Sequence, residues 1–240
     1  MQHGHSIEEI RERISGSRKV NYLRDCVFGG IDGTITTFAI VAGVEGAALS
    51  PAIILILGIA NVLADGFSMA AGNYSATKTE IDDIKRIRAF ELHQIEQFPE
   101  GEREEIRQIL VQKGLTGDAL EEATKAMTAN PDTWVDMMMV DEYGKSPTEP
   151  KPLAAALATF FSFLLCGFVP LLPFLFGLPQ PFLTATLLTA LVFLSIGMFK
   201  SKWSLSPWWV SGLETFAIGS CAALIAYLAG WLLRNLAIGI

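Results

Sequence analysis

The feature that most constrains this chain is a series of long apolar stretches separated by turns rich in proline and glycine. A helix that crosses the hydrocarbon core of a bilayer needs about 20 mostly apolar residues. Mean hydropathy is +0.39 and only 18% of the residues are charged, which is unlike a soluble domain of this length. The sequence therefore predicts an all-α membrane protein with five transmembrane helices, at residues 22–44, 51–75, 153–176, 182–199 and 208–233.

A charged insert separates the second and third apolar stretches. Residues 80–150 hold 17 of the 25 acidic and 8 of the 18 basic residues. Prolines and glycines divide the insert into a continuation of the second span to residue 97 and three further helices, near 99–113, 118–129 and 131–143. The predicted organisation is an N-terminal arm (1–19), two spans (20–75), a helical metal-binding insert (76–151) and three spans (152–240). The acidic balance argues against nucleic acid as a partner.

Lysine and arginine predict the orientation. Basic residues flank the first span on its N-terminal side and follow the fourth span, whereas residues 45–50 and 177–181 contain none. By the positive-inside rule, the N-terminus and the insert are cytoplasmic and the C-terminus is outside. The polar N-terminus lacks the apolar core of a signal peptide, which favours a bacterial or archaeal plasma membrane, with a vacuolar membrane as the alternative. The basic residues concerned are Arg11, Arg13, Arg18, Lys19, Arg24, Lys200 and Lys202.

A few polar residues lie inside the predicted spans. Asp32 is in the middle of the first span and Asp65 in the middle of the second, where a charge is expensive and calls for a partner or a function. Asn61, Asp65 and Met69 recur every four residues and share a helical face, which Asn73 extends. The two asparagines fit helix packing equally well. Met69 either packs in the apolar helix or, four residues from Asp65, supplies a thioether, and carboxylates with a thioether suit a transition-metal ion. Asp32, Asp65, Met69 and Asn61 are the predicted translocation path.

The insert carries acidic residues and methionines at helical spacing. Glu102 and Glu105 are three residues apart, and Glu142 lies four residues after Met138 and three after Met139. An acidic helix taken alone is usually a solvated surface. Three consecutive methionines in a polar segment either pack against neighbouring helices or supply sulfur to a metal site built with carboxylates. No Glu-x-x-His pair occurs, so a ferritin-type di-iron centre is not indicated.

Several motifs together resemble the vacuolar iron transporter family, which includes related manganese transporters. They are Phe28-Gly-Gly-Ile-Asp-Gly, Ala64-Asp-Gly-Phe-Ser-Met-Ala-Ala-Gly-Asn-Tyr74, the helices with Glu91, Pro99 and Glu102-Arg-Glu-Glu105, and Met138-Met-Val-Asp-Glu-Tyr-Gly144. The similarity extends from about residue 21 to the end. The resemblance implies a homodimer with a path at the subunit interface, lined by Asp32 and Met69. It also implies export of Fe²⁺ or Mn²⁺ from the cytosol against a counter-flow of protons.

The resemblance further implies that the insert collects metal. Two departures remove charge from this scheme: Gln94 stands where the family tends to have a second glutamate, and Asn61 stands where some relatives are acidic. Met139 joins the predicted ligands as the neighbour of Met138. The predicted metal-binding residues are Glu91, Glu102, Glu105, Met138, Met139 and Glu142.

These observations predict a proton-coupled exporter of Fe²⁺, Mn²⁺ or both in the lipid bilayer. No prosthetic group is expected, and the insert is also suited to bind Zn²⁺ or Co²⁺. The alternative is a membrane-anchored metal-binding or storage protein, although an anchor does not need Asp32 and Asp65 at membrane depth. No His-Glu-x-x-His or Gly-x-Ser-x-Gly motif occurs, so the chain is not predicted to be an enzyme.

Overall fold

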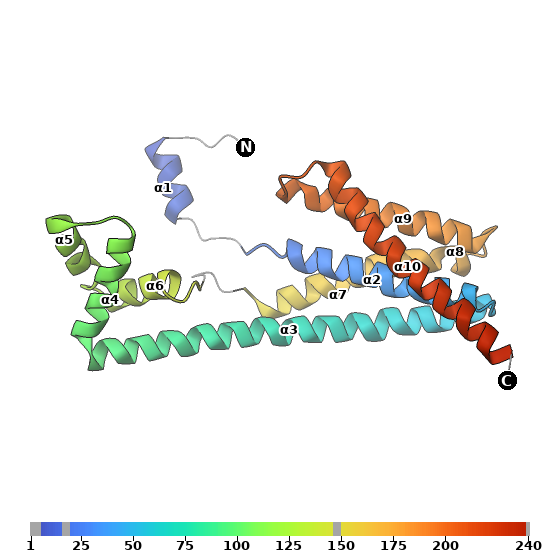
Figure 1. Ribbon diagram of the computed structural model, residues 1–240, viewed down its shortest axis with the longest axis horizontal. Coiled ribbons are helices and arrows are strands. Elements are labelled where there is room, and N and C mark those ends of the chain that lie inside the picture. Colours follow the sequence, from blue (N-terminus) through green and yellow to red (C-terminus); the bar gives the residue numbers. More distant parts are fainter. Residues whose placement is uncertain (1–5, 16–19, 146–149, 239–240) are drawn as a thin grey trace. The chain divides into compact units, whose positions relative to one another are not determined.

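The computed structural model describes residues 6–15, 20–145 and 150–238, and every regular element in these ranges is a helix (Figure 1). Arg18 and Lys19 of the predicted basic arm lie outside the described residues, as does the side chain of Arg13. The chain forms two compact units. The membrane unit comprises Asn21–Ala76 and Lys151–Ile240, and the insert unit comprises Thr77–Pro150 together with Met1–Val20.

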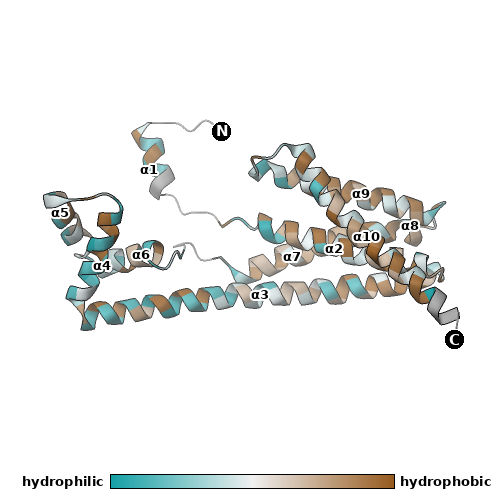
Figure 2. Ribbon diagram, in the orientation of Figure 1, coloured by the Kyte–Doolittle hydropathy of each residue, from teal (hydrophilic) through white to brown (hydrophobic). Residues whose placement is uncertain are grey.

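Five long apolar segments run through the chain, as the sequence predicted. They are Leu23–Gly46, Pro51–Gln97, Pro152–Leu175, Pro181–Trp203 and Trp208–Arg234, and each is long and apolar enough to cross a bilayer. The corresponding helices are α2 (Leu23–Gly46), α3 (Pro51–Gln97), α7 (Pro152–Phe168), α9 (Pro181–Lys200) and α10 (Trp208–Ile238). Figure 2 shows hydrophobic residues concentrated on α7, α9 and α10, and hydrophilic residues recurring along the later part of α3 and on α4.

Helix α2 is central to the membrane unit, because it packs against α7, α9 and α10. Close approach depends on glycine: a Cβ added at Gly33 would overlap the backbone of Phe163 in α7. Small residues at such crossings let helix backbones come together and form van der Waals contacts in lipid. The buried side chains nearby include Phe38, Val41, Val62 and Leu171.

The third span differs from the uninterrupted stretch that its hydropathy predicted. Helix α7 ends at Phe168, and a 3₁₀ turn, η1 (Val169–Leu171), and a short helix, α8 (Leu172–Leu175), complete the crossing. Pro170 and Pro173 are the cause, because proline has no backbone N–H to donate and its ring clashes with the preceding turn. A second 3₁₀ turn, η2 (Ser201–Trp203), follows α9.

The insert unit contains the later part of α3, then α4 (Pro99–Gln112), α5 (Gly117–Met127) and α6 (Pro131–Asp141); α1 is Ile7–Ser15. Prolines at the first turns of α4 and α6 favour helix initiation, since the N–H they lack would be unpaired there. The side chain of Asn130 caps α6 by accepting from the backbone N–H groups of Asp132 and Thr133. The core of the unit is Ile106, Leu110, Leu120, Trp134 and Met138.

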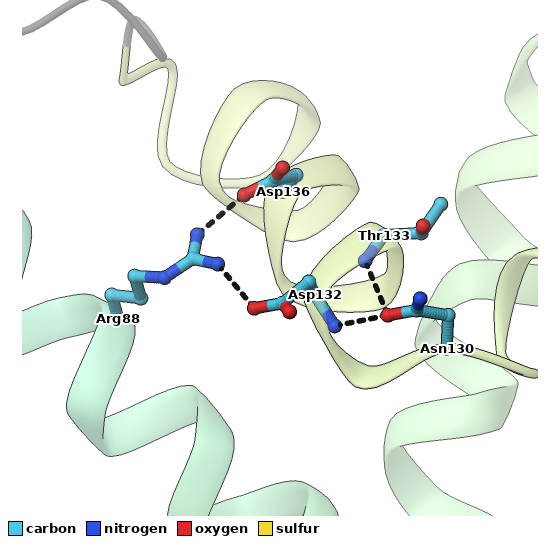
Figure 3. Close-up of polar contacts among 5 residues, drawn as sticks. All are labelled: Arg88, Asn130, Asp132, Thr133 and Asp136. Atoms are coloured by element: carbon cyan, nitrogen blue, oxygen red, sulfur yellow. Dashed lines mark hydrogen bonds and ion pairs between the residues drawn. The ribbon is translucent and has the colours of Figure 1, made fainter.

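Ion pairs join α6 to the rest of the insert unit. Arg88 of α3 pairs with both Asp132 and Asp136, which lie one turn apart on α6 (Figure 3), and the pair with Asp132 measures 2.9 Å. Lys113, just after α4, contacts Asp141 at 2.6 Å. These pairs orient α6, the helix that carries the predicted methionine ligands.

Candidate metal-binding and translocation residues

Two carboxylates lie half-buried within the membrane unit. Asp32 is on α2 and Asp65 on α3, and they are close enough for the charge of Asp65 to act on Asp32. Asn61 and Met69 are also half-buried, one turn before and one turn after Asp65. The structure thus places all four predicted path residues in one unit, with the two acidic residues within reach of each other's charge. Like charges in such surroundings repel strongly and are relieved by a bound cation or proton.

The asparagines make hydrogen bonds between helices. Asn61 Nδ2 lies 3.4 Å from Thr36 Oγ1, at the long limit for such a bond. Asn73 Nδ2 donates to Asp25 Oδ1 and Thr159 Oγ1, each at 2.8 Å, and so connects α3 with α2 and α7. Helix packing, one of the two readings that the sequence left open, is therefore present at Asn73 and only weakly at Asn61.

Four carboxylates of the insert unit form one electrostatic cluster. Burial and the charges of Glu105, Glu91 and Glu142 together raise the pKa of Glu102 to about 7. Partial burial of the carboxyl group and the charge of Glu91 raise the pKa of Glu105, and burial with the charges of Glu105 and Glu91 raises the pKa of Glu142. The cluster therefore combines residues of the consecutive helices α3 and α4 with Glu142, which directly follows α6.

Members of this cluster differ in exposure. Glu91 is 2% exposed and Glu102 7%, whereas Glu105 and Glu142 are exposed as whole residues. Atom Oε2 of Glu102 is buried with no hydrogen-bond partner among the described residues. A buried oxygen without a partner loses its solvation without compensation, so a cation would stabilise it.

The arrangement is not a closed metal site. No three His, Cys, Asp or Glu side chains of the described residues converge closely enough to hold an ion. The cluster is nevertheless electrostatically coupled, because Coulomb forces act over longer distances than the 2.0–2.2 Å or so of a metal–oxygen bond. Met138 is fully buried in the helical core and Met139 is 6% exposed, so packing accounts for both side chains in this structure.

Tyr143 is a neighbour of the cluster that the sequence analysis did not single out. Its hydroxyl donates to Glu91 Oε1 at 2.5 Å. This hydrogen bond, with burial and the charges of Glu91 and Glu142, raises the pKa of Tyr143, so the phenol stays protonated. Tyr143 immediately follows Glu142 in the motif around Met138, but helical spacing alone gives no reason to pair it with a residue 52 positions earlier.

Five apolar spans, with carboxylates at Asp32 and Asp65 and an acidic helical insert, define a polytopic membrane protein. The chain belongs to the VIT family, whose sequence profile matches residues 23–231. This membership confirms the resemblance seen in the sequence motifs. It also places the chain among transporters rather than enzymes.

Several proteins similar to this chain are named as iron transporters. The chain is 32% identical over 228 residues to vacuolar iron transporter 1 of Oryza sativa subsp. japonica, covering 94% of this chain and 89% of the relative. It is 34% identical over 209 residues to vacuolar iron transporter 1 of Arabidopsis thaliana (85% and 83% covered). It is 32% identical over 249 residues to the vacuolar iron transporter of Toxoplasma gondii (96% and 82% covered).

Proposed function

We propose that this protein is a proton-coupled transporter that exports Fe²⁺, Mn²⁺ or both from the cytosol. Family membership and the names of the relatives support metal transport, and iron as the cargo. The observation that carries the proposal is the pair Asp32 and Asp65, half-buried on two spans and within reach of each other's charge. An anchor for a soluble metal store would not need this pair.

The chemistry follows from neutralisation. Two carboxylates in a medium of low polarity are stabilised by one divalent cation or by protons, so the pair can exchange one for the other. Met69, one turn from Asp65, adds a thioether that favours a transition metal over Mg²⁺ or Ca²⁺. Asn61 offers a neutral oxygen one turn in the other direction. Protons arriving from the far side would release the cation, which gives the direction of export.

In this proposal the insert unit captures the cation before transport. Glu91, Glu102, Glu105 and Glu142 supply carboxylate oxygens, and a cation among them would relieve the mutual repulsion described above. Met138 and Met139 would turn sulfur to the metal only after leaving the core positions they occupy here. The carboxylates also suit Zn²⁺ and Co²⁺, so selectivity for transport is assigned to the membrane residues.

We place the N-terminus and the insert in the cytosol and the C-terminus outside, on the distribution of lysine and arginine. The names of the relatives favour a vacuole-type membrane over the bacterial or archaeal plasma membrane that the sequence suggested first. A homodimer with the path at its interface is consistent with the exposed apolar side chains of α3, such as Leu63 and Phe67, which lie on the helix that carries Asp65 and Met69.

Reconstituted liposomes test the proposal. Purified protein would be placed in vesicles containing an Fe²⁺-sensitive dye, and Fe²⁺ added outside without oxygen, with and without a pH gradient. Metal entry that the gradient accelerates is expected, and Asp32→Asn should abolish it. Glu214→Gln is the matched control, because Glu214 is also an acidic residue of a span but pairs with Lys200 at 3.0 Å.

Three results would count against the proposal. Fe²⁺ that binds the protein without entering the vesicles would favour the storage alternative. Fe²⁺ entry at the same rate with and without the pH gradient would contradict proton coupling. Unchanged entry in Asp32→Asn would remove the assigned path.

A further inference from the structure

The chain after α6 turns back on the helix in a defined way. Glu142 N donates to Met138 O at 2.9 Å, Tyr143 N to the same oxygen at 3.3 Å, and Lys145 N to Met139 O at 2.8 Å. Gly144 has φ +62°, in the left-handed region that glycine adopts at helix ends. These backbone hydrogen bonds fix the backbone at Tyr143 independently of the contact that its side chain makes.

Two side chains of this turn bond to α3. The Tyr143 hydroxyl donates to Glu91 Oε1 at 2.5 Å, and Lys145 Nζ contacts Asp83 Oδ2 at 2.7 Å. The two contacts differ in their surroundings. Glu91 is 2% exposed, and its charge acts on the other carboxylates of the cluster. The Lys145–Asp83 pair is about one-third exposed and contacts none of these carboxylates.

A buried carboxylate needs a hydrogen-bond donor to satisfy its oxygens and to hold its orientation. Glu91 acts electrostatically on Glu102, Glu105 and Glu142, so without a donor its carboxylate would be free to turn away from them. A short hydrogen bond to a carboxylate is charge-assisted and stronger than a neutral one. Hydrogen-bond donors to metal-ligating carboxylates fix their direction, and losing one typically weakens metal affinity about 10- to 100-fold.

We propose that Tyr143 is a positioning residue for metal capture, whose hydroxyl holds the Glu91 carboxylate in the orientation that receives the cation. The inference rests on the proposed function, since it needs Glu91 to bind metal. It adds a residue without which the cluster is incomplete. Because Tyr143 is next to Glu142 in the chain, its hydrogen bond also connects Glu91 on α3 with Glu142 at the end of α6.

The test compares two ways of loosening the same turn. Full-length purified protein would be titrated with Fe²⁺ without oxygen. Tyr143→Phe removes only the hydroxyl, and we expect about 10- to 100-fold weaker binding. Lys145→Gln breaks the other contact between the same turn and the same helix, and we expect unchanged binding. If Tyr143 acts through Glu91, the double variant Glu91→Gln/Tyr143→Phe binds no more weakly than Glu91→Gln alone.

The outcomes separate this inference from the proposed function. Wild-type binding in Tyr143→Phe, an equal loss in Lys145→Gln, or additive losses in the double variant would overturn the role of Tyr143 and leave metal capture intact. A wild-type protein that takes up no Fe²⁺, or a Glu91→Gln variant that binds normally, would overturn both.

Discussion

The membrane unit and the insert unit keep acidic residues in two different ways. In the membrane unit, helices meet backbone to backbone at positions such as Gly33, and the carboxylates of Asp32 and Asp65 lie half-buried. In the insert unit, side chains form the core, ion pairs such as Arg88 with Asp132 and Asp136 join its helices, and four carboxylates repel one another. In the insert unit, core packing and ion pairs offset the repulsion between the four carboxylates.

Under the proposed function, the insert unit captures the cation and the membrane unit transports it. In the proposed function, Asp32 and Asp65 carry the cation through the bilayer, where few polar groups are available to pair with a charge. A site among water-facing helices can gather several weak ligands, because surrounding ion pairs and hydrogen bonds hold them. Four measurements would break or sharpen this comparison, beginning with the largest expected effect.

Asp65→Asn should reduce Fe²⁺ entry into liposomes to the level of empty vesicles, because one carboxylate alone cannot neutralise a divalent cation in a medium of low polarity. Fe²⁺ binding by the full-length protein should persist, since the insert carboxylates are unchanged. Normal entry in this variant would show that the membrane pair is not the path.

Gly33→Leu should destabilise the membrane unit, because the added side chain starts against the backbone of Phe163. Overpacking of this kind costs about 1–3 kcal/mol or more. Gly72→Leu is the matched control, since a Cβ there meets nothing within 4 Å in the described structure. Thermal unfolding in detergent should give a lower midpoint for Gly33→Leu alone; equal midpoints would contradict the backbone contact.

Glu102→Gln should change how the stability of the insert depends on pH. The pKa of Glu102 is raised from 4.5 in the unfolded chain to about 7 in the folded one. The folded state therefore holds the proton more tightly, and the resulting stability is present below pH 4.5 and lost as pH rises through about 7. Hydrogen exchange of α4 in metal-free full-length protein should show the variant gaining protection over wild type at pH 8. No relative gain would mean that Glu102 is not strained by its neighbours.

Arg88→Gln should have the smallest effect. It removes the ion pairs to Asp132 and Asp136, which are partly exposed and therefore contribute on the order of 1 kcal/mol (Figure 3). Faster hydrogen exchange is expected in α6, with no change in the membrane helices. A loss of protection throughout the chain would show that the two units do not unfold separately.

Prediction from sequence worked best where one local rule decides the outcome. Apolar length predicted the five spans, and the prolines at 51, 99 and 131 mark helix starts that the structure retains. The break at Pro170 was not anticipated, because an apolar stretch of sufficient length gives no sign of where a helix changes to a 3₁₀ turn. Among site residues, the motifs named Glu91, Glu102, Glu105 and Glu142, but not which of them are buried.

The sequence by itself determined that this chain is helical, crosses a membrane about five times, carries an acidic insert and belongs to a family of metal transporters. Those properties depend on composition, helical spacing and short motifs, which are local. Only the tertiary structure decided that Glu91 is buried while Glu105 is exposed, that Met138 serves the core, and that Tyr143 bonds to Glu91. Burial and hydrogen bonding between distant residues depend on how helices meet, and no local pattern encodes that.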